Sequence, residues 1–159
     1  MGSAFTTSST LLKNSLKNDV TIIYNGKSIQ EVALWDTGAT NTCISEEVVK
    51  KLSLIPTGKI TMRTPTGEDE RNAYLVDIVL PNDVTINDHV VIDSKIGEQN
   101  IGMLVGMDII TRGDFSVSNF NNQTVFTFRI PSERKTDYVQ ELIIEKLIGQ
   151  KHGKGKRKH

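Results

Sequence analysis

The stretch Ala33-Leu34-Trp35-Asp36-Thr37-Gly38-Ala39-Thr40 places an acidic residue directly after three apolar ones, with a glycine two positions later. Asp-Thr-Gly alone is a good turn sequence, because Asp bonds to its own turn and Gly tolerates a positive φ. An ordinary turn and a rigidly held catalytic carboxylate are therefore the two interpretations of this stretch, and its three central letters do not decide between them.

A second informative stretch, Ile101-Gly102-Met103-Leu104-Val105-Gly106-Met107-Asp108-Ile109-Ile110, follows about seventy residues later. It predicts a short apolar strand, a glycine, and a single helical turn that begins near Asp108. This second stretch is the context in which the Asp36 turn is interpreted.

The residues around these two stretches predict many short strands. Asn25-Gly26 between two β-prone runs is a strong hairpin signal, and Ser45 is expected to cap a short helix over 46–52. The strands are expected at 20–24, about 27–34, 59–63, 71–80, 84–92, 103–105, 115–117 and 124–130. Short strands at this density predict an all-β barrel or sandwich.

The two stretches and the hairpin between them resemble the retropepsins, the retrovirus-type aspartic proteases, and look closest to their bacterial and phage members. In that family an apolar-apolar-Asp-Thr/Ser-Gly-Ala motif precedes an apolar-Gly-x-Asp/Asn-apolar-apolar motif, and residues 20–130 match in order and spacing. The resemblance implies a mostly-β fold: a single-lobe, closed acid-protease barrel with a flap hairpin. A short helix after Gly-x-Asp and a C-terminal amphipathic helix would complete it.

The resemblance also implies the activity of an aspartic endopeptidase. Peptide hydrolysis by water needs a base and an acid, and two carboxyl groups about 3 Å apart share one proton and supply both. The chain has one Asp-Thr-Gly, and two-lobed pepsin-like enzymes need roughly twice its length. An active enzyme would therefore be a homodimer acting on peptide or protein substrates, with Asp36 of each copy at the two-fold axis.

The resemblance implies a role for each residue beside Asp36. Thr37 would hydrogen-bond across the dimer, while Gly38 and Ala39 would line the cleft. Gly106 and Asp108 would shape the element packed behind the turn, which is a structural role. The flap tip would consist of four residues, with an ordinary surface hairpin as the alternative: Thr64, Pro65, Thr66 and Gly67.

Two positions depart from the pattern of many retroviral enzymes, which carry an ion pair where this chain has Thr40 and Met107. Their joint replacement suggests less polar packing and a changed dimer geometry. Trp35 is larger than the usual Leu and is expected either at the interface or in the core. Cys43 is interpreted as a buried, small apolar residue rather than a redox group.

Length and composition limit the other classes of protein to which this chain could belong. The 159 residues fit one domain, and a single Cys fits a reducing compartment without a disulfide framework. No apolar run reaches the ~20 residues of a membrane span, and no charged, apolar leader opens the chain. With no cluster of metal ligands and no phosphate-binding loop, we expect a cytoplasmic protein without metal, cofactor or membrane contact.

The net charge of zero conceals an asymmetry. Five of the 19 basic residues and none of the 19 acidic residues lie in 151–159, so residues 1–150 carry a net charge of −5. This basic tail could contact nucleic acid, but it has no aromatic residue on which bases would stack, and a disordered, solvated tail is favoured.

The domain organisation follows from these signals. Residues 1–18 are expected to form a flexible polar arm and residues 19–131 the protease domain. Residues 132–150 would contain a C-terminal helix, with its apolar periodicity at 137–148, and 151–159 the tail. The helix would cover the body or the partner subunit.

Two functions other than proteolysis remain open at this stage. One is a catalytically silent dimerisation or binding module with the same fold, and the other is a nucleic-acid accessory that acts through residues 151–159.

Overall fold

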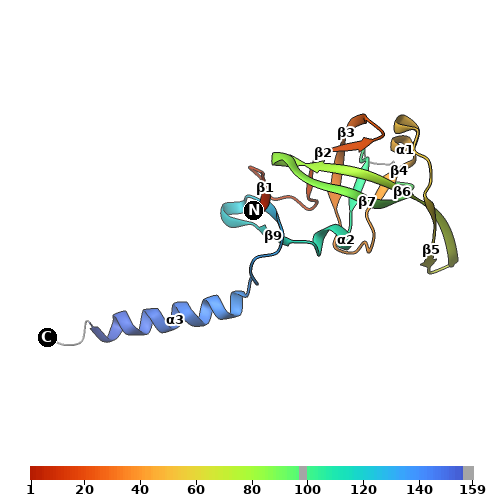
Figure 1. Cartoon of the computed structure of the whole chain (residues 1–159). Helices are drawn as coiled ribbons and strands as arrows, with labels where there is room; N and C mark the ends of the chain where they lie inside the picture. The colour runs from red at the N-terminus through yellow and green to blue at the C-terminus, as the bar shows by residue number, and fades with distance from the viewer. Residues whose placement is uncertain (97–99, 156–159) are drawn as a thin grey trace.

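The structure is a computed structural model that describes residues 1–96 and 100–155 (Figure 1). Its strands are β1 Ser3–Ser8, β2 Lys17–Tyr24, β3 Lys27–Trp35, β4 Cys43–Ser45, β5 Gly58–Thr64, β6 Gly67–Leu80, β7 Val84–Ser94, β8 Met103–Val105, β9 Asp114–Ser118 and β10 Val125–Ile130. Its α-helices are α1 Glu46–Leu52, α2 Met107–Ile110 and α3 Tyr138–Gly155, with 3-10 turns at Pro81–Asp83 and Phe120–Asn122.

The main sheet closes into a barrel. Its strands lie in the order β2-β3-β8-β4-β7-β6-β5, and a further pairing of β2 with β6 joins Thr21 to Val79 and Ile23 to Asp77. Six strands thereby form a closed barrel, while β5 extends outside it as the partner of β6. The predicted mostly-β, single-lobe closed barrel is confirmed.

Local sequence signals explain why the elements begin and end where they do. Asn25 and Gly26 both have positive φ, at 49° and 76°, as a two-residue hairpin turn requires. The Ser45 side chain accepts a hydrogen bond of 3.2 Å from the backbone N–H of Val48 and so caps α1. The first turn of α1 also carries two acids, which its positive end favours.

A second sheet, in the order β1-β10-β9, corrects the expectation of a flexible arm over residues 1–18. Ser3–Ser8 pairs with β10 from Ser3 opposite Ile130 to Ser8 opposite Val125. The side chain of Phe5 is 4% exposed. The polar composition of residues 1–18 hid this strand, because one buried Phe and backbone pairing are enough to dock it.

The core fills the barrel and continues beneath the second sheet. An aromatic cluster occupies the space between the two sheets, and we call it the aromatic floor: Phe5, Trp35, Phe115, Phe126 and Phe128. Trp35 stacks on Phe115 with ring centroids 5.1 Å apart and is 6% exposed. Of the two expectations for Trp35, core packing is therefore the one observed in the single chain.

The C-terminal helix differs from its prediction in length and in packing. α3 runs from Tyr138 to Gly155, so residues 151–155 of the expected disordered tail are helical, and residues 156–159 lie outside the described part of the chain. Figure 1 shows α3 extending away from the barrel. All of its described side chains are exposed, so it does not cover the body of its own chain. None of the helices in the described part of the chain is both long and apolar enough to cross a membrane.

Candidate active site

The Asp36 turn begins where β3 ends. The backbone N–H of Asp36 donates a hydrogen bond to Val105 O of β8 at 2.9 Å. The N–H of Ala39 donates a second one to Asp36 O at 3.2 Å. The N–H of Gly38 donates to Asp36 Oδ1 at 2.8 Å. Three hydrogen bonds thus hold both the backbone and the carboxylate of Asp36, which gives the side chain a defined direction.

The four residues predicted at the turn are adjacent and reach the surface. The side chain of Asp36 is half-buried, Thr37 and Gly38 are exposed, and Ala39 is half-buried. A Cβ atom at Gly38 would lie 3.1 Å from Asp36 Oδ1, closer than ordinary packing allows. The absence of a side chain at Gly38 therefore keeps the surroundings of the carboxylate open.

The second motif packs directly behind this turn. The N–H of Met107 donates to Ala39 O at 2.8 Å, and the N–H of Asp108 donates to Thr40 O at 3.2 Å. A Cβ at Gly106 would come within 2.7 Å of the Asn41 carbonyl, so only glycine fits there without a backbone shift. The tertiary structure thus joins the two stretches that the sequence separates by about seventy residues.

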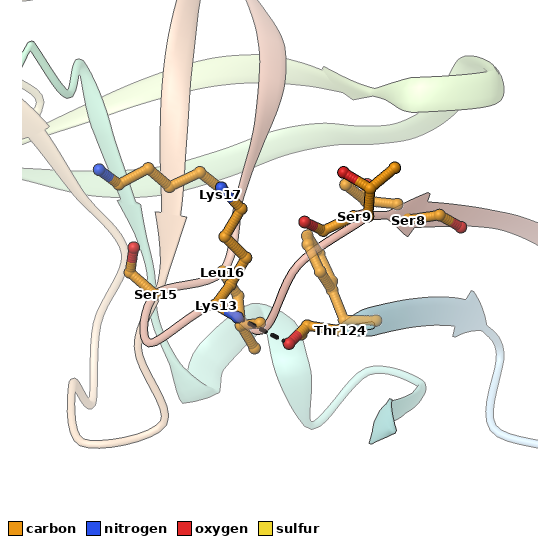
Figure 2. Close-up of a pocket in the computed structure, with 10 residues that line it drawn as sticks. Ser8, Ser9, Lys13, Ser15, Leu16, Lys17 and Thr124 are labelled. Carbon is orange, nitrogen blue, oxygen red and sulfur yellow. Dashed lines mark hydrogen bonds between the residues drawn. The ribbon is translucent and has the colours of Figure 1, made fainter. Parts of the chain in front are cut away.

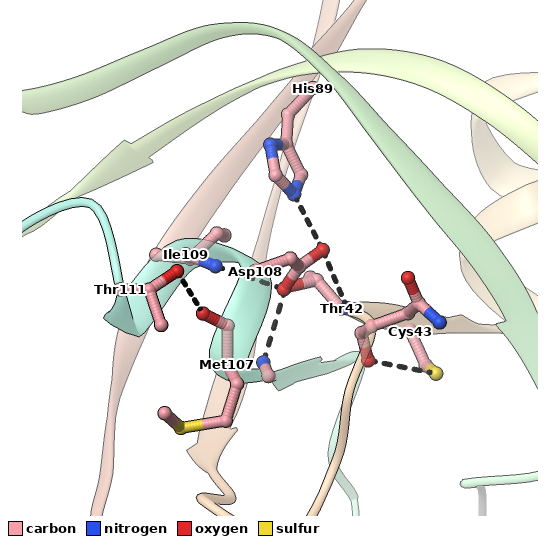
Figure 3. A network of polar contacts seen from close by, with 9 residues as sticks. Thr42, Cys43, His89, Met107, Asp108, Ile109 and Thr111 are labelled. Carbon is pink, nitrogen blue, oxygen red and sulfur yellow. Dashed lines mark hydrogen bonds and ion pairs between the residues drawn. The ribbon is translucent and has the colours of Figure 1, made fainter.

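Asp108 is the centre of a polar network behind the turn (Figure 3). Its Oδ2 accepts from the backbone N–H of Thr42 at 2.9 Å, and its Oδ1 accepts from the Thr42 hydroxyl at 2.7 Å. The Thr42 hydroxyl in turn accepts from the N–H of Gly106 at 3.1 Å. His89 Nε2 lies 2.9 Å from Asp108 Oδ2. The network links the segment after the turn, the second motif and β7.

These contacts determine how the Asp108 carboxyl titrates. Burial raises its pKa, but the hydrogen bonds from His89 and Thr42 outweigh burial and hold the pKa below its ordinary value. The carboxylate is therefore ionised near neutral pH. It supports the backbone of the turn as a fixed acceptor.

Sequence reasoning missed His89 and Thr42. Thr42 is fully buried, and His89 reaches the network from β7, nineteen residues away from Asp108. No spacing rule connects a single His on one strand to an Asp on a distant helix. The only available signal was the polar His89 in an otherwise β-prone run, which is not specific.

Cys43 lies beside this network and is half-buried rather than fully buried. Its thiol contacts Asn41 O at 3.5 Å. Burial, followed by the charge of Asp108, raises the pKa of the thiol. The thiol is therefore protonated near neutral pH, which agrees with the interpretation of Cys43 as a packing residue.

The β5–β6 hairpin carries the four predicted flap residues at its tip. Thr64 pairs with Gly67, whose φ of 140° favours glycine, and the Thr64 hydroxyl donates to Gly67 O at 3.0 Å. The hairpin projects from the barrel in Figure 1, and its tip residues 63–68 are exposed. Pro65 and Thr66 form the two-residue turn between the strands.

The two positions that depart from the retroviral pattern occupy different environments. Thr40 is exposed, and its carbonyl accepts from Asp108. Met107 is half-buried and packs on the core. Met107 thus makes apolar contacts where many retroviral enzymes carry a charge, and Thr40 contributes its backbone to the second motif.

Several hollows border the second sheet in the described part of the chain, and two of them matter for the Asp36 turn and for the N-terminal segment. One, of about 510 Å³, lies between β10 and the segment after β1, and Figure 2 shows Lys13 donating its backbone N–H to Thr124 Oγ1 at 2.8 Å there. No residue of the Asp36 turn lines it. The other is lined by Thr37, by Met107 and by residues of the segment before α3. The second hollow therefore lies between the Asp36 turn and the segment before α3.

Comparisons with known proteins identify the family of the chain. The sequence profile of the family described as "gag-polyprotein putative aspartyl protease" matches residues 20–112, more than half of the chain, so the chain belongs to that family. No curated protein sequence matches the chain significantly.

Among solved structures, a retropepsin-like aspartic protease from Rickettsia conorii is 16% identical with a TM-score of 0.52, covering 81% of this chain and 95% of its own. Simian foamy virus (mac) protease is 20% identical with a TM-score of 0.43, and the match covers 60% of this chain and 91% of the viral protease chain. The EIAV protease is 20% identical with a TM-score of 0.44, and the match covers 62% of this chain and 88% of the EIAV protease chain. The Rickettsia structure shows that the fold is retropepsin-like.

Proposed function

Starting from membership of the gag-polyprotein aspartyl protease family, we propose that this chain is an aspartic endopeptidase whose Asp36 acts together with Asp36 of a second copy. The observation that carries the proposal is the geometry of the Asp36 turn. Its carboxylate is half-buried, held by the Gly38 N–H and backed by the second motif. The bond from Gly38 also occurs in ordinary turns, so the support for a rigidly held carboxylate comes from the second motif, whose Met107 and Asp108 N–H groups donate to Ala39 O and Thr40 O.

The number of Asp-Thr-Gly motifs in the chain supports the need for a second copy to complete the active site. One Asp-Thr-Gly supplies one carboxyl group, whereas general acid and general base roles in the same step require two. A two-fold axis that passes beside the turn would bring the same carboxyl group from both copies together. Thr37 is exposed next to Asp36, which supports a contact with its counterpart in the second copy.

The chemistry then follows from one shared proton. The ionised carboxylate removes a proton from water while the oxygen attacks the peptide carbonyl carbon, and the protonated carboxyl donates its proton to the carbonyl oxygen. The tetrahedral intermediate collapses as the C–N bond breaks: the protonated carboxyl donates its proton to the leaving nitrogen, and the ionised carboxylate takes a proton from a hydroxyl group of the intermediate. The released products are a carboxylic acid and an amine, and the dyad returns to its singly protonated state.

The flap hairpin is proposed to close over the bound peptide and to exclude water. Its tip, 64–67, extends from the barrel without packing on it, which leaves the hairpin room to move. The reducing environment that a single Cys fits supports a cytoplasmic location, which we also propose.

The substitution Asp36→Asn tests the proposal. It should reduce cleavage of a peptide library by at least about a thousandfold, since the general acid-base contribution is lost, and it should leave the fold unchanged. Asp19→Asn, at an exposed position, is the matched control. Undiminished cleavage by the Asp36 variant would disprove the mechanism. A dimeric but inactive unaltered chain would instead indicate the silent binding module.

A further inference from the structure

The strand β6 divides into two parts that have different neighbours. From Ala73 onward it pairs with β7, beginning with Ala73 opposite Ile92. Before Ala73 it pairs with β5, and β5 has no other partner strand in the described part of the chain. The flap hairpin that projects from the barrel in Figure 1 is therefore a two-stranded ribbon, which is only marginally stable without a third strand or other support.

The pairing of β6 with β7 ends in a contact to a side chain. The next pair of an antiparallel ladder after Ala73 and Ile92 would join the backbones of Asn72 and Asp93. Instead, the backbone N–H of Asn72 donates to Asp93 Oδ1 at 3.1 Å. The Tyr74 hydroxyl donates to Asp93 Oδ2 at 3.3 Å. We call Asp93, Asn72 and Tyr74 the hinge clamp, because they meet where the ribbon leaves the barrel.

Two members of the hinge clamp belong to the barrel itself. The backbone of Asp93 is paired with Ile44 of β4, in the segment that follows the Asp36 turn. Tyr74 is 3% exposed. Burial, followed by the charge of Asp93, raises the pKa of Tyr74, so its hydroxyl keeps the proton that it donates. The carboxylate is thus fixed to the barrel, and Asn72 is the member that belongs to the ribbon.

The β5 side of the ribbon is held one residue further into the barrel. The backbone N–H and the hydroxyl of Thr57 both donate to Ala73 O, at 2.8 Å and 3.3 Å. Asn72 is the first residue of β6 beyond this junction. An Asp side chain turns readily about its Cβ–Cγ bond, whereas ladder bonds fix the direction of two strands relative to each other. The bond from Asn72 to Asp93 therefore holds the ribbon at a point that can still bend.

The two faces of the ribbon differ in exposure. Residues that lie directly opposite each other in the hairpin share a face. The side chains of one face are half-buried, namely Ile60, Met62, Asp69 and Arg71, and those of the other are exposed, namely Thr61, Arg63, Glu68 and Glu70. Burial is the largest influence on the pKa of the Cys43 thiol, which Arg71 lowers and Asp36 raises. The half-buried face thus lies toward the segment that follows the Asp36 turn.

We propose that Asp93 is a positioning residue for the flap, whose carboxylate holds Asn72 and so limits how far the hairpin opens above the Asp36 turn. The assignment rests on the proposed function, because the position of a flap matters for cleavage only when a peptide binds beneath it. Without the carboxylate, the hairpin should stay folded but occupy a wider range of positions, since hinge motion is absorbed by a few residues at the end of an element.

Spin-label distance measurements on the full chain test this role. In a Cys43→Ser background, labels at Thr66→Cys and Lys27→Cys report the position of the flap tip relative to the β2–β3 hairpin, and both sites are exposed. Dilution into an excess of unlabelled chain ensures that each measured pair lies within one molecule. The distance distribution of the Asp93→Ala chain should be wider than that of the unaltered chain and should extend to longer distances.

Two further variants make the distance measurement specific. Asp93→Asn keeps an oxygen that accepts from Asn72, so its distribution should stay close to that of the unaltered chain. Asp77→Ala is the matched control, because Asp77 Oδ1 also accepts a backbone N–H, from Asp88 at 2.8 Å, in the part of β6 that belongs to the barrel. An unchanged distribution for Asp93→Ala, or equal widening by Asp77→Ala, would overturn the proposal.

Kinetics separate a positioning role from general loss of structure. With a library peptide that the unaltered chain cleaves, Asp93→Ala should raise KM about tenfold, as expected for one lost hydrogen bond to a charged acceptor, and should lower kcat less. The flap contacts the bound peptide in the ground state and in the transition state alike, so its loss weakens binding more than chemistry. Asp93→Asn should recover most of the change in KM. A fall in kcat at constant KM would contradict a role in holding the flap.

The two measurements keep this proposal separate from the proposed function. The label distances require no cleavage, so they decide the role of Asp93 even if the unaltered chain cleaves no peptide. That result would disprove the Asp36 mechanism alone. Normal cleavage by the unaltered chain together with an unwidened Asp93→Ala distribution would disprove the hinge clamp alone.

Discussion

The aromatic floor beneath the Asp36 turn buries its apolar side chains, whereas the helix α3 exposes its own. Phe5, in a segment with few other apolar residues, is 4% exposed and packs edge-on against Phe126 with ring centroids 6.0 Å apart. Ile144, in a far more apolar segment, is 54% exposed. The difference teaches that burial depends on the neighbours that the fold supplies and not on how apolar a segment is.

The two regions also differ in what they can contribute to the site. The aromatic floor and the network around Asp108 restrict the backbone on which Asp36 sits. The described side chains of α3 are exposed, and the helix supports none of this in the single chain. Stability of the single chain should therefore be sensitive to the first region and insensitive to the second.

The largest effect is expected for Phe5→Ala. Removal of this ring leaves a cavity in the aromatic floor and should lower the free energy of unfolding by about 3–5 kcal/mol. Urea denaturation of the monomeric chain measures it. Phe120→Ala is the matched control, because Phe120 is 80% exposed and its loss should cost less than about 0.5 kcal/mol. If both substitutions lowered the free energy of unfolding equally, burial of Phe5 in the aromatic floor would not contribute to stability.

Gly106→Ala should have the next largest effect. Its new methyl group would meet the Asn41 carbonyl at 2.7 Å and the Ala39 carbonyl oxygen at 2.9 Å. The forced shift should destabilise the chain by about 1–3 kcal/mol and displace the Asp36 turn. Gly58→Ala is the control, since nothing lies within 4 Å of the corresponding position. A stable Gly106→Ala chain would show that the two motifs are loosely packed.

Asp108→Asn should have a smaller effect that depends on pH. The hydrogen bonds that hold the pKa of Asp108 below its ordinary value of 3.8 stabilise the ionised form in the folded chain. This contribution is complete above the ordinary pKa and is lost as the pH falls through the lowered pKa. The variant should be less stable by about 1–2 kcal/mol at neutral pH.

The difference in free energy of unfolding between the unaltered chain and the Asp108→Asn variant should become smaller below about pH 4. Denaturation at a series of pH values checks it, with Asp19→Asn as the control for the loss of one negative charge. A gap that stays constant down to the most acidic pH would contradict the assignment of this stability to an ionised Asp108.

The smallest effect is expected in α3. Leu142→Ser removes an apolar side chain that is 56% exposed, and the free energy of unfolding of the monomeric chain should change by less than about 0.5 kcal/mol. Thermal denaturation at low protein concentration measures this change. A loss comparable to that of Phe5→Ala would mean that α3 packs on its own barrel in solution.

The sequence predicted those parts of the fold that depend on local chemistry. The Asn25-Gly26 turn, the cap at Ser45 and the strand-to-helix step at Gly106 all lie where their residues indicated. Each depends on the conformational preference of one or two residues or on a hydrogen bond within a few positions. The resemblance in motif order then related these elements to a single closed barrel.

The parts that could not be predicted depend on contacts between distant positions. The strand Ser3–Ser8 requires β10, more than 110 residues later, as its partner. His89 reaches Asp108 only because β7 passes behind the second motif. Neither contact leaves a periodic or compositional signal, because a single residue makes it in each case.

By itself, the sequence determined that this chain carries one Asp-Thr-Gly turn at the end of an apolar strand and a second glycine-acid step downstream. It also determined that the C-terminal segment is helical. Only the tertiary structure decided that the two motifs are in contact, that a polar N-terminal segment is packed, and that an apolar helix is exposed. The physical reason is that turns and caps are set by adjacent residues, whereas burial is set by the surfaces that folding brings together.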